Sequence, residues 1–277
     1  MVRRLFRLWR LYAAMDAGLL LRNGRAFLIW YLSDMVSTTA SVMGTLLLAE
    51  RFSGVGVWSR EQLLFLLGYG LLVNGIAGTF FSYNVSHISR RLGRGQLDHT
   101  LIQPLPIWMA LLTEGFMPIS MSAVMLPGIG LTLWALAHLP VVVTPAWIAL
   151  LVLHLLASTT VMMAFSFLWG SLAFWAPRGA EEISSSAMQI VSDLKPFPLD
   201  GTGPLFAAGL LTALPVGFVA WMPARALLDL SQSPAADGAT PLAAVILAAL
   251  AAVAFRRGLA QYGRTGSQRY SGWGHRG

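Results

Sequence analysis

The longest uncharged stretch of the chain is GFMPISMSAVMLPGIGLTLWALAHLPVVVTPAWIALLVLHLLASTTVMMAFSFLWGSLAFWAP, residues 115–177. It holds 63 residues without Asp, Glu, Lys or Arg. One membrane crossing needs about 20 apolar residues, so the stretch is long enough for two. The segment HLPVVVTP at 138–145 contains two prolines, which are typical of a short loop. The stretch therefore predicts two membrane helices joined by that loop.

The whole chain has a similar composition. Of its 277 residues, 56% are hydrophobic and only 11% are charged, whereas soluble domains carry about a quarter charged residues. This excludes most cytosolic enzymes and secreted modules and predicts a polytopic membrane protein. Helices are expected because lipid offers backbone groups no hydrogen-bonding partner, and the apolar runs lack the alternation of a membrane barrel.

Further charge-poor runs complete the expected architecture. We predict an all-α fold with six transmembrane helices, near residues 26–49, 62–85, 107–137, 146–176, 205–222 and 238–257. These form one transmembrane domain, 26–257. A segment 1–25 precedes it, and a polar, glycine-rich tail, 258–277, follows it and is expected to be disordered.

The basic residues predict the orientation. Of 19 Lys and Arg, 16 fall in the N-terminal segment, the loops 86–106 and 177–204 and the tail, and three fall on the other side. Lys and Arg are enriched in cytoplasmic loops, so both termini are expected in the cytoplasm. In segment 1–25, Arg3, Arg7 and Arg10 share one helical face opposite apolar side chains. This pattern predicts an amphipathic helix in the headgroup plane, either a topology anchor or an elbow that contacts a cytoplasmic partner.

Motifs for covalent chemistry are missing. Lys195 is the only lysine, and no Gly-Lys-Ser/Thr follows a glycine-rich turn, so the chain has no P-loop of its own. Cysteine is absent, and no HExxH zinc motif occurs. The pair Glu181-Glu182 lacks the following arginine of CAAX-type membrane proteases, and Gly170-Ser171 lacks the flanking glycine of rhomboid-type sites. We therefore predict no catalytic residue, no metal site and no cofactor bound by this chain.

Two acids lie inside predicted spans, Asp34 and Glu114. An unpaired carboxylate in a membrane helix costs about 2.5–3.5 kcal/mol, so such acids normally face a bundle interior or a water-filled path. Either they make structural hydrogen bonds, or they line a cargo path that favours cationic or polar groups. Further polar positions of spans 1 and 2 are candidates for the same path: Thr38, Ser41, Asn74 and Thr79. Glycines at 68, 70, 75 and 78 predict close helix packing, within the chain or between subunits.

The loop 86–106, SHISRRLGRGQLDHTLIQPLP, combines a basic cluster, a Gly-Arg-Gly turn, a short amphipathic piece and two prolines. It is either a solvated cytoplasmic loop or a contact helix for a soluble ATPase subunit. The run from Arg94 to Pro106 resembles the "R-G-x-L-D-x-x-L-x-x-P-L-P" signature of ABC-2 type transporter permeases, in the branch called ABC-2 family transporter protein. Two later runs also resemble that family, Leu214–Ala224 and Phe255–Tyr262.

The resemblance implies the permease subunit of an ATP-driven ABC exporter in the bacterial cytoplasmic membrane, working by alternating access. It implies a second permease, alike or related, and two ABC ATPase subunits that bind ATP and Mg²⁺; the other expected partner is membrane lipid, not nucleic acid. The loop would hold the ATPase-coupling helix, with contacts from Arg94, Gly95, Leu97, Asp98, Leu101, Pro104 and Pro106. The stretch 223–232 would form a re-entrant or periplasmic lid element that includes Pro223, Arg225 and Asp229.

Other functions are compatible with the composition. A substrate-capture subunit of an ABC/ECF-type vitamin uptake system also has six small spans but would couple to its ATPase through another protein. An intramembrane enzyme would act without nucleotide, and a structural scaffold would show no solute-stimulated ATPase activity. For a transporter, the apolar spans and the two acids predict a hydrophobic, amphipathic or cationic cargo.

Overall fold

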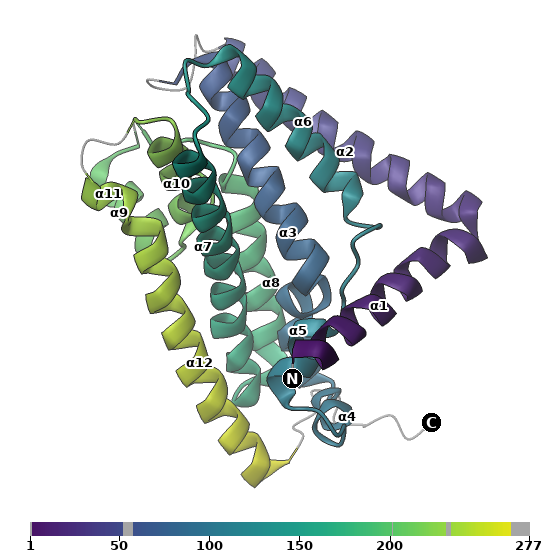
Figure 1. Ribbon diagram of the computed structural model, residues 1–277. Helices are drawn as coiled ribbons and strands as arrows, with labels where there is room; N and C mark the ends of the chain where they lie inside the picture. Colours follow the sequence, from purple (N-terminus) through teal and green to yellow (C-terminus); the bar gives the residue numbers. More distant parts are fainter. Residues whose placement is uncertain (1, 52–57, 201, 231–233, 267–277) are drawn as a thin grey trace.

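The computed structural model describes residues 2–51, 58–200, 202–230 and 234–266. Over these ranges the chain forms twelve α-helices and two 3₁₀ helices, most of them gathered into one elongated bundle (Figure 1). The predicted all-α class is therefore confirmed for the described residues. The prediction of disorder for the tail falls partly outside these ranges, and residues 258–265, assigned to that tail, are helical.

Helix α3 (Arg60–Gly93) is the central element of the bundle. A capping box begins it: the Gln62 backbone N–H donates to Ser59 Oγ at 3.3 Å, and the Ser59 N–H donates to Gln62 Oε1 at 2.8 Å. The large side chains Phe65 and Tyr69 are fully buried. Helices α6, α7 and α8 pack around α3, which explains why the span predicted at 62–85 is buried on most sides.

The predicted glycine packing lies within the chain, between α3 and α6 (Ser122–His138). A Cβ atom on Gly68 would lie 2.5 Å from Thr132 Oγ1 and 2.8 Å from the Thr132 backbone nitrogen. A Cβ atom on Gly75 would lie 2.9 Å from Met125 Cβ. Gly70 differs, because its nearest neighbour would be Ala220 at 3.8 Å.

Three helical stretches are individually long and apolar enough to cross a membrane: Arg60–Phe81 of α3, α7 (Pro145–Gly170) with its 3₁₀ extension η1 (Ser171–Phe174), and α12 (Ala239–Thr265). They match the second, fourth and sixth predicted spans. Thr144 Oγ1 caps the start of α7 by accepting the Trp147 N–H at 3.1 Å. The loop predicted at 138–145 lies between α6 and α7, as expected.

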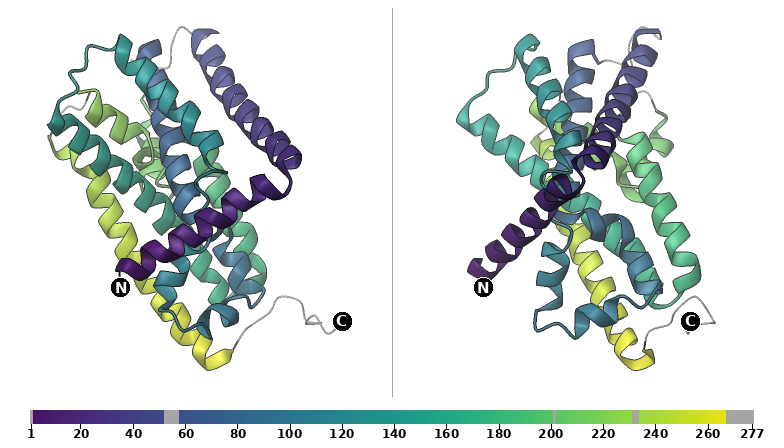
Figure 2. Two further views of the ribbon diagram at one scale, coloured as in Figure 1. Left: turned by 45° about the vertical axis from the view of Figure 1, so that its right-hand side comes forward. Right: turned by 90° about the vertical axis from the view of Figure 1, so that its right-hand side faces the viewer.

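The N-terminal segment is helical, as predicted. Helix α1 (Val2–Arg22) meets α2 (Gly24–Arg51) at Asn23, and α1 leaves the bundle at a wide angle (Figure 2). Asp16 of α1 is buried, and its carboxylate accepts the backbone N–H groups of Ile119 and Ser120 at 2.7 and 3.1 Å and the Ser120 hydroxyl. This carboxylate ties α1 to the chain just before α6.

The span predicted at 107–137 is wrong as one continuous helix. It consists of α5 (Ile107–Thr113) and α6, separated by turns at 114–121. Gly115 has a positive φ of 90°, which a helix cannot contain, and Pro118 follows it in the break. The Asp16 carboxylate satisfies two of the backbone N–H groups that the break leaves without helical partners.

The segment 177–204, predicted to be a cytoplasmic loop, instead runs along the bundle. It contains α8 (Pro177–Leu194), which packs against α3. At one end of α3, Glu181 forms an ion pair with Arg90 at 2.5 Å, and at the other end, Asp200 accepts the Trp58 indole N–H at 2.5 Å. Residues 181–200 therefore run along α3 from one end to the other.

The span predicted at 205–222 is wrong as one continuous helix. The segment contains α9 (Pro204–Thr212), η2 (Val216–Phe218) and α10 (Trp221–Leu227), with a bend of 71° between α9 and the η2–α10 piece. Arg225 forms an ion pair with Asp200 at 2.7 Å, so the chain returns at residue 225 to the point it left at residue 200. The segment therefore folds back on itself, and we call it the re-entrant segment; α11 (Pro234–Asp237) follows it at the same end of the bundle (Figure 1).

Candidate transport cavity and coupling segment

A polar cavity of about 470 Å³ lies between α2, α3 and the end of α8. Four of the six predicted path residues line it together: Asp34, Thr38 and Ser41 from α2, and Asn74 from α3. On α2 the lining positions 34, 37, 38, 41 and 45 recur every three or four residues, so they form one polar stripe along the helix. Three of these positions, 34, 38 and 41, are among the polar residues that the sequence analysis named for the path.

The cavity also contains charges that the sequence analysis missed. Ser192, Asp193 and Lys195 line it from the end of α8. Lys195 is buried, and its ammonium donates to Ser192 Oγ at 3.2 Å. Burying a lysine ammonium among membrane helices costs free energy unless polar groups surround it. The cavity supplies such groups. The signal in the sequence was the single lysine of the chain, but it was assigned to a loop.

Glu114 and Thr79, also predicted for the path, lie elsewhere. The Glu114 carboxylate pairs with the buried Arg91 guanidinium at 2.6 Å. Thr79 is buried, and its carbonyl accepts the Met117 N–H at 3.0 Å. Burial and, to a lesser degree, the negative charge of Glu114 raise the pKa of the Tyr12 phenol, because α1 lies beside this pair. Glu114 therefore makes the structural ion pair that the sequence analysis gave as its alternative role.

The signature residue Gly95 ends α3 in a Schellman turn. The Gln96 N–H donates to the Arg91 carbonyl at 2.9 Å, and the Gly95 N–H donates to the Leu92 carbonyl at 3.1 Å. Gly95 has a φ of 69°, a conformation that side chains other than glycine rarely adopt. The turn redirects the chain into α4 (Leu97–Leu101), the short helix that stands where the coupling helix was expected.

Leu97 does not present an exposed docking surface, which corrects the role expected for its side chain. It is 0% exposed and belongs to a small apolar cluster between α3, α5, η1, α8 and α12. Its side chain therefore anchors α4 to the bundle. The other buried members of this cluster are Ile88, Leu92, Leu111, Ala173, Phe174, Ala180 and Tyr262.

Polar contacts hold α4 in place as well. The Tyr262 hydroxyl of α12 donates to Asp98 Oδ1 at 2.6 Å, which joins two of the motifs that carry the family resemblance. One turn earlier in α12, Gly258 lies so close to Phe174 that a Cβ atom would approach its ring to 2.0 Å. The Arg91 guanidinium donates to Thr100 Oγ1 at 2.6 Å. These contacts connect α4 directly to α3 and α12.

The exposed part of this segment lies at the end of α4 and just beyond it. Leu101 is 46% exposed and Ile102 is 80% exposed, and Arg94, Pro104 and Pro106 are also exposed. The Arg4 guanidinium of α1 donates to the Pro104 carbonyl at 3.0 Å, so the amphipathic helix contacts the same segment. We call residues 94–106 the coupling segment.

At the opposite end of the bundle, Asp200 holds the re-entrant segment. Its carboxylate accepts the indole N–H groups of Trp58 and Trp221, at 2.5 and 2.6 Å, and pairs with Arg225. Of the predicted lid residues, Arg225 makes this ion pair, and Pro223 is buried. Asp229 ends α10 with a positive φ of 53°. The sequence analysis missed Asp200.

Comparison with known proteins gives one match. The sequence model of a family described as ABC-2 family transporter protein matches residues 35–266. The matched region runs from α2 to the end of α12, including the coupling segment and the re-entrant segment, and leaves α1 outside. No curated protein and no solved structure matches the chain.

Proposed function

The chain belongs to the ABC-2 family of transporter proteins, and from this we propose that it is the permease subunit of an ATP-driven ABC exporter. Membership makes it a multi-pass membrane protein that serves transport. Export, the ATPase partners and the cargo are the further parts of the proposal.

The observation that carries the proposal is the construction of the coupling segment. Its buried anchor Leu97 and the Asp98–Tyr262 hydrogen bond join it to the helices of the bundle, while Leu101 and Ile102 extend outward. A surface that must transmit force from a soluble subunit needs a rigid attachment and an exposed apolar contact. A solvated loop would need neither.

In the proposed mechanism the energy comes from two ABC ATPase subunits, which bind ATP and Mg²⁺. Their closure would push on Leu101 and Ile102, and the contacts of α4 would pass this displacement to α3 and α12. Two permease subunits would then rock between inward- and outward-facing states. This chain contributes binding surfaces and rigid helices, and no covalent step.

A second permease subunit is supported by the polar surface of α8. This helix buries a narrow stripe, Ala180, Ser184, Ala187 and Val191, at heptad spacing. Most of its remaining surface is exposed and includes Glu182, Ser185, Gln189 and Asp193. Exposed polar groups at membrane depth face protein or water rather than lipid. We propose that the second subunit covers this side of the bundle and encloses the cavity beside it.

The proposed orientation has six crossings and both termini in the bacterial cytoplasm. The crossings are α2, α3, α5 with α6, α7 with η1, the segment 177–200, and α12. Compared with the topology predicted from the sequence, this arrangement moves Lys195 from a cytoplasmic loop into a crossing. It keeps the arginine-rich ends of α3 and α12 on the cytoplasmic side, in agreement with the bias of basic residues. The re-entrant segment lies at the outer end.

The lining of the cavity limits the proposed cargo. Its charged groups are two carboxylates, Asp34 and Asp193, and one ammonium, Lys195. Together with hydroxyl groups of α2, they favour a cationic or zwitterionic polar group attached to an apolar body. The match to a transporter family favours a transport function over that of an intramembrane enzyme.

Co-purification with an ABC ATPase encoded beside the gene tests the proposal. The wild-type chain should retain the ATPase through gel filtration, and Ile102→Glu should lose it, because a carboxylate would enter an apolar contact. Ile102→Leu is the matched control and should retain the ATPase. A wild-type chain that binds its ATPase only through an additional membrane protein would support the substrate-capture subunit instead.

A further inference from the structure

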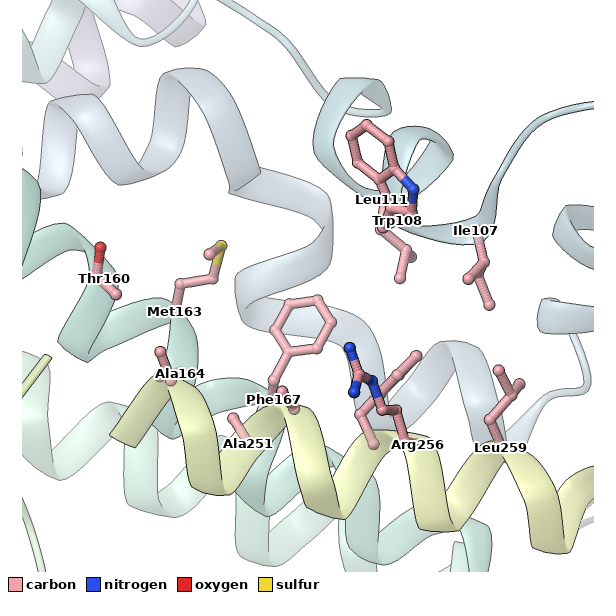
Figure 3. Close-up of a pocket in the computed structure, with 13 residues that line it drawn as sticks. Ile107, Trp108, Leu111, Thr160, Met163, Ala164, Phe167, Ala251, Arg256 and Leu259 are labelled. Atoms are coloured by element: carbon pink, nitrogen blue, oxygen red, sulfur yellow. The ribbon is translucent and has the colours of Figure 1, made fainter. Parts of the chain in front are cut away.

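An apolar groove of about 420 Å³ lies on the side of the bundle formed by α5, α7 and α12 (Figure 3). It is separate from the polar cavity and shares none of its lining residues. Small side chains of α12, Ala248, Ala251 and Ala252, create the space, and Met163 and Phe167 of α7 form another wall. The groove therefore results from the alanine-rich face of α12.

Polar groups are few along the groove. The Thr160 hydroxyl donates to the Leu156 carbonyl at 2.7 Å, so it is already satisfied. The Trp108 indole and the Arg256 guanidinium lie toward the other end, with Ile107 and Leu259 (Figure 3). The groove thus has an apolar end near Met163 and a cationic end at Arg256. This combination suits an amphiphile.

The length of the groove matches one leaflet of a bilayer. Its lining runs along α12 from Ala248 to Leu259, which is about 17 Å at 1.5 Å per residue. The hydrocarbon core of a bilayer is about 30 Å thick, so one leaflet takes about half of that. The Arg256 end lies at the basic end of α12, beside Arg257 and near the coupling segment. Trp108 is 42% exposed there, as tryptophan at a membrane interface often is.

Arg256 is exposed, and no acidic side chain among the described residues forms an ion pair with it. A guanidinium binds phosphate oxygens with paired hydrogen bonds, and basic sites between membrane helices on the cytoplasmic side bind anionic headgroups. We propose that the groove binds one acyl chain of an anionic phospholipid from the cytoplasmic leaflet, with the Arg256 guanidinium on its headgroup phosphate. The lipid would bridge α5 and α12, two of the elements that contact α4.

Native mass spectrometry of the detergent-purified chain with added phosphatidylglycerol tests this proposal. The wild type should retain one phosphatidylglycerol molecule per chain. Arg256→Gln should reduce its retention at least tenfold, and Ala252→Phe should abolish it by filling the groove. Arg257→Gln removes the same charge from the neighbouring exposed position, which does not line the groove, and should retain the lipid like the wild type.

Two further arms identify the bound species. Phosphatidylcholine should be retained more weakly than phosphatidylglycerol, and excess inorganic phosphate should not displace the lipid, because the acyl chain contributes most of the binding. Equal retention by the wild type, Arg256→Gln and Ala252→Phe would overturn the proposal, as would an equal loss in Arg257→Gln. ATPase binding is measured separately, so failure here is distinguishable from failure of the proposed function.

Discussion

Ser41 tests whether the cavity beside α2 is a water-filled path. The chain has no cysteine, so a single introduced thiol gives an unambiguous signal. We expect Ser41→Cys to react with a membrane-impermeant maleimide, because its side chain lines the polar cavity. Ile246→Cys on α12 is exposed but apolar in its surroundings, so lipid should protect it. Equal labelling of the two positions would contradict the path.

Tyr262 tests the link between α4 and α12. Tyr262→Phe removes the hydroxyl that donates to Asp98 but retains the ring that packs against Phe174. The lost hydrogen bond is worth about 1 kcal/mol, so the protein should stay folded. In reconstituted complexes, we expect ATP hydrolysis to continue while nucleotide-driven changes in the cavity weaken. An unchanged cavity response would show that this bond is not needed for transmission.

The candidate path residues show what a single sequence can predict at the residue scale. Asp34, Thr38 and Ser41 were named because they are polar positions of one predicted span, and all three line the same cavity. Glu114 was grouped with Asp34 because both acids lie inside predicted spans. The break at 114–121 separates it from the cavity, and the buried Arg91 supplies its partner. Charge pairing between distant positions is not visible in a hydropathy pattern.

At the scale of elements, the buried Leu97 of α4 and the exposed Ile102 just after it are expected to respond differently to substitution. Leu97→Arg would bury an unpaired charge, which costs several kcal/mol, so we expect loss of folded protein in fluorescence-detected gel filtration. Ile102→Glu changes an exposed side chain and should leave the same elution profile as the wild type. Normal folding of Leu97→Arg would contradict the buried anchor.

The contact between α3 and α6 depends on glycine. Gly68→Ala would force a Cβ atom against the Thr132 backbone, and overpacking of this kind costs about 1–3 kcal/mol. We expect a lower melting temperature in detergent. Gly130→Ala in α6 is the matched control, because its Cβ atom would meet nothing within 4 Å. Equal melting temperatures for the two variants would rule out close packing at Gly68.

The elements that hydropathy predicted well are the ones that are apolar over a long window. The stretch of α7 with η1 was predicted close to its observed bounds, and the starts of α3 and α12 were predicted within two residues. The segment 177–200 was missed because Glu181, Glu182, Asp193 and Lys195 interrupt its apolar residues. The segment 205–222 was predicted as one continuous helix because it is apolar, and its bend of 71° was missed. The contacts of Trp221 and Arg225 with Asp200 show that both its ends lie together.

At the scale of the whole molecule, the bundle has two different sides. On one side α2 and α8 flank the cavity with polar side chains and also expose apolar ones. On the other, α7 and α12 expose apolar side chains and border the groove with Arg256. In the proposed assembly the first side meets a second permease subunit and the other meets lipid. The coupling segment contacts elements of both sides through α3 and α12.

The most direct test of the central claim measures whether the coupling segment controls access to the polar cavity. Ser41→Cys is labelled with maleimide in proteoliposomes that contain the chain and its ABC ATPase, before and after trapping with ADP and vanadate. We predict that trapping changes the labelling rate several-fold, and that adding Ile102→Glu abolishes the change. A labelling rate that trapping leaves unaltered, or that changes equally without the ATPase, would contradict a permease driven through its coupling segment.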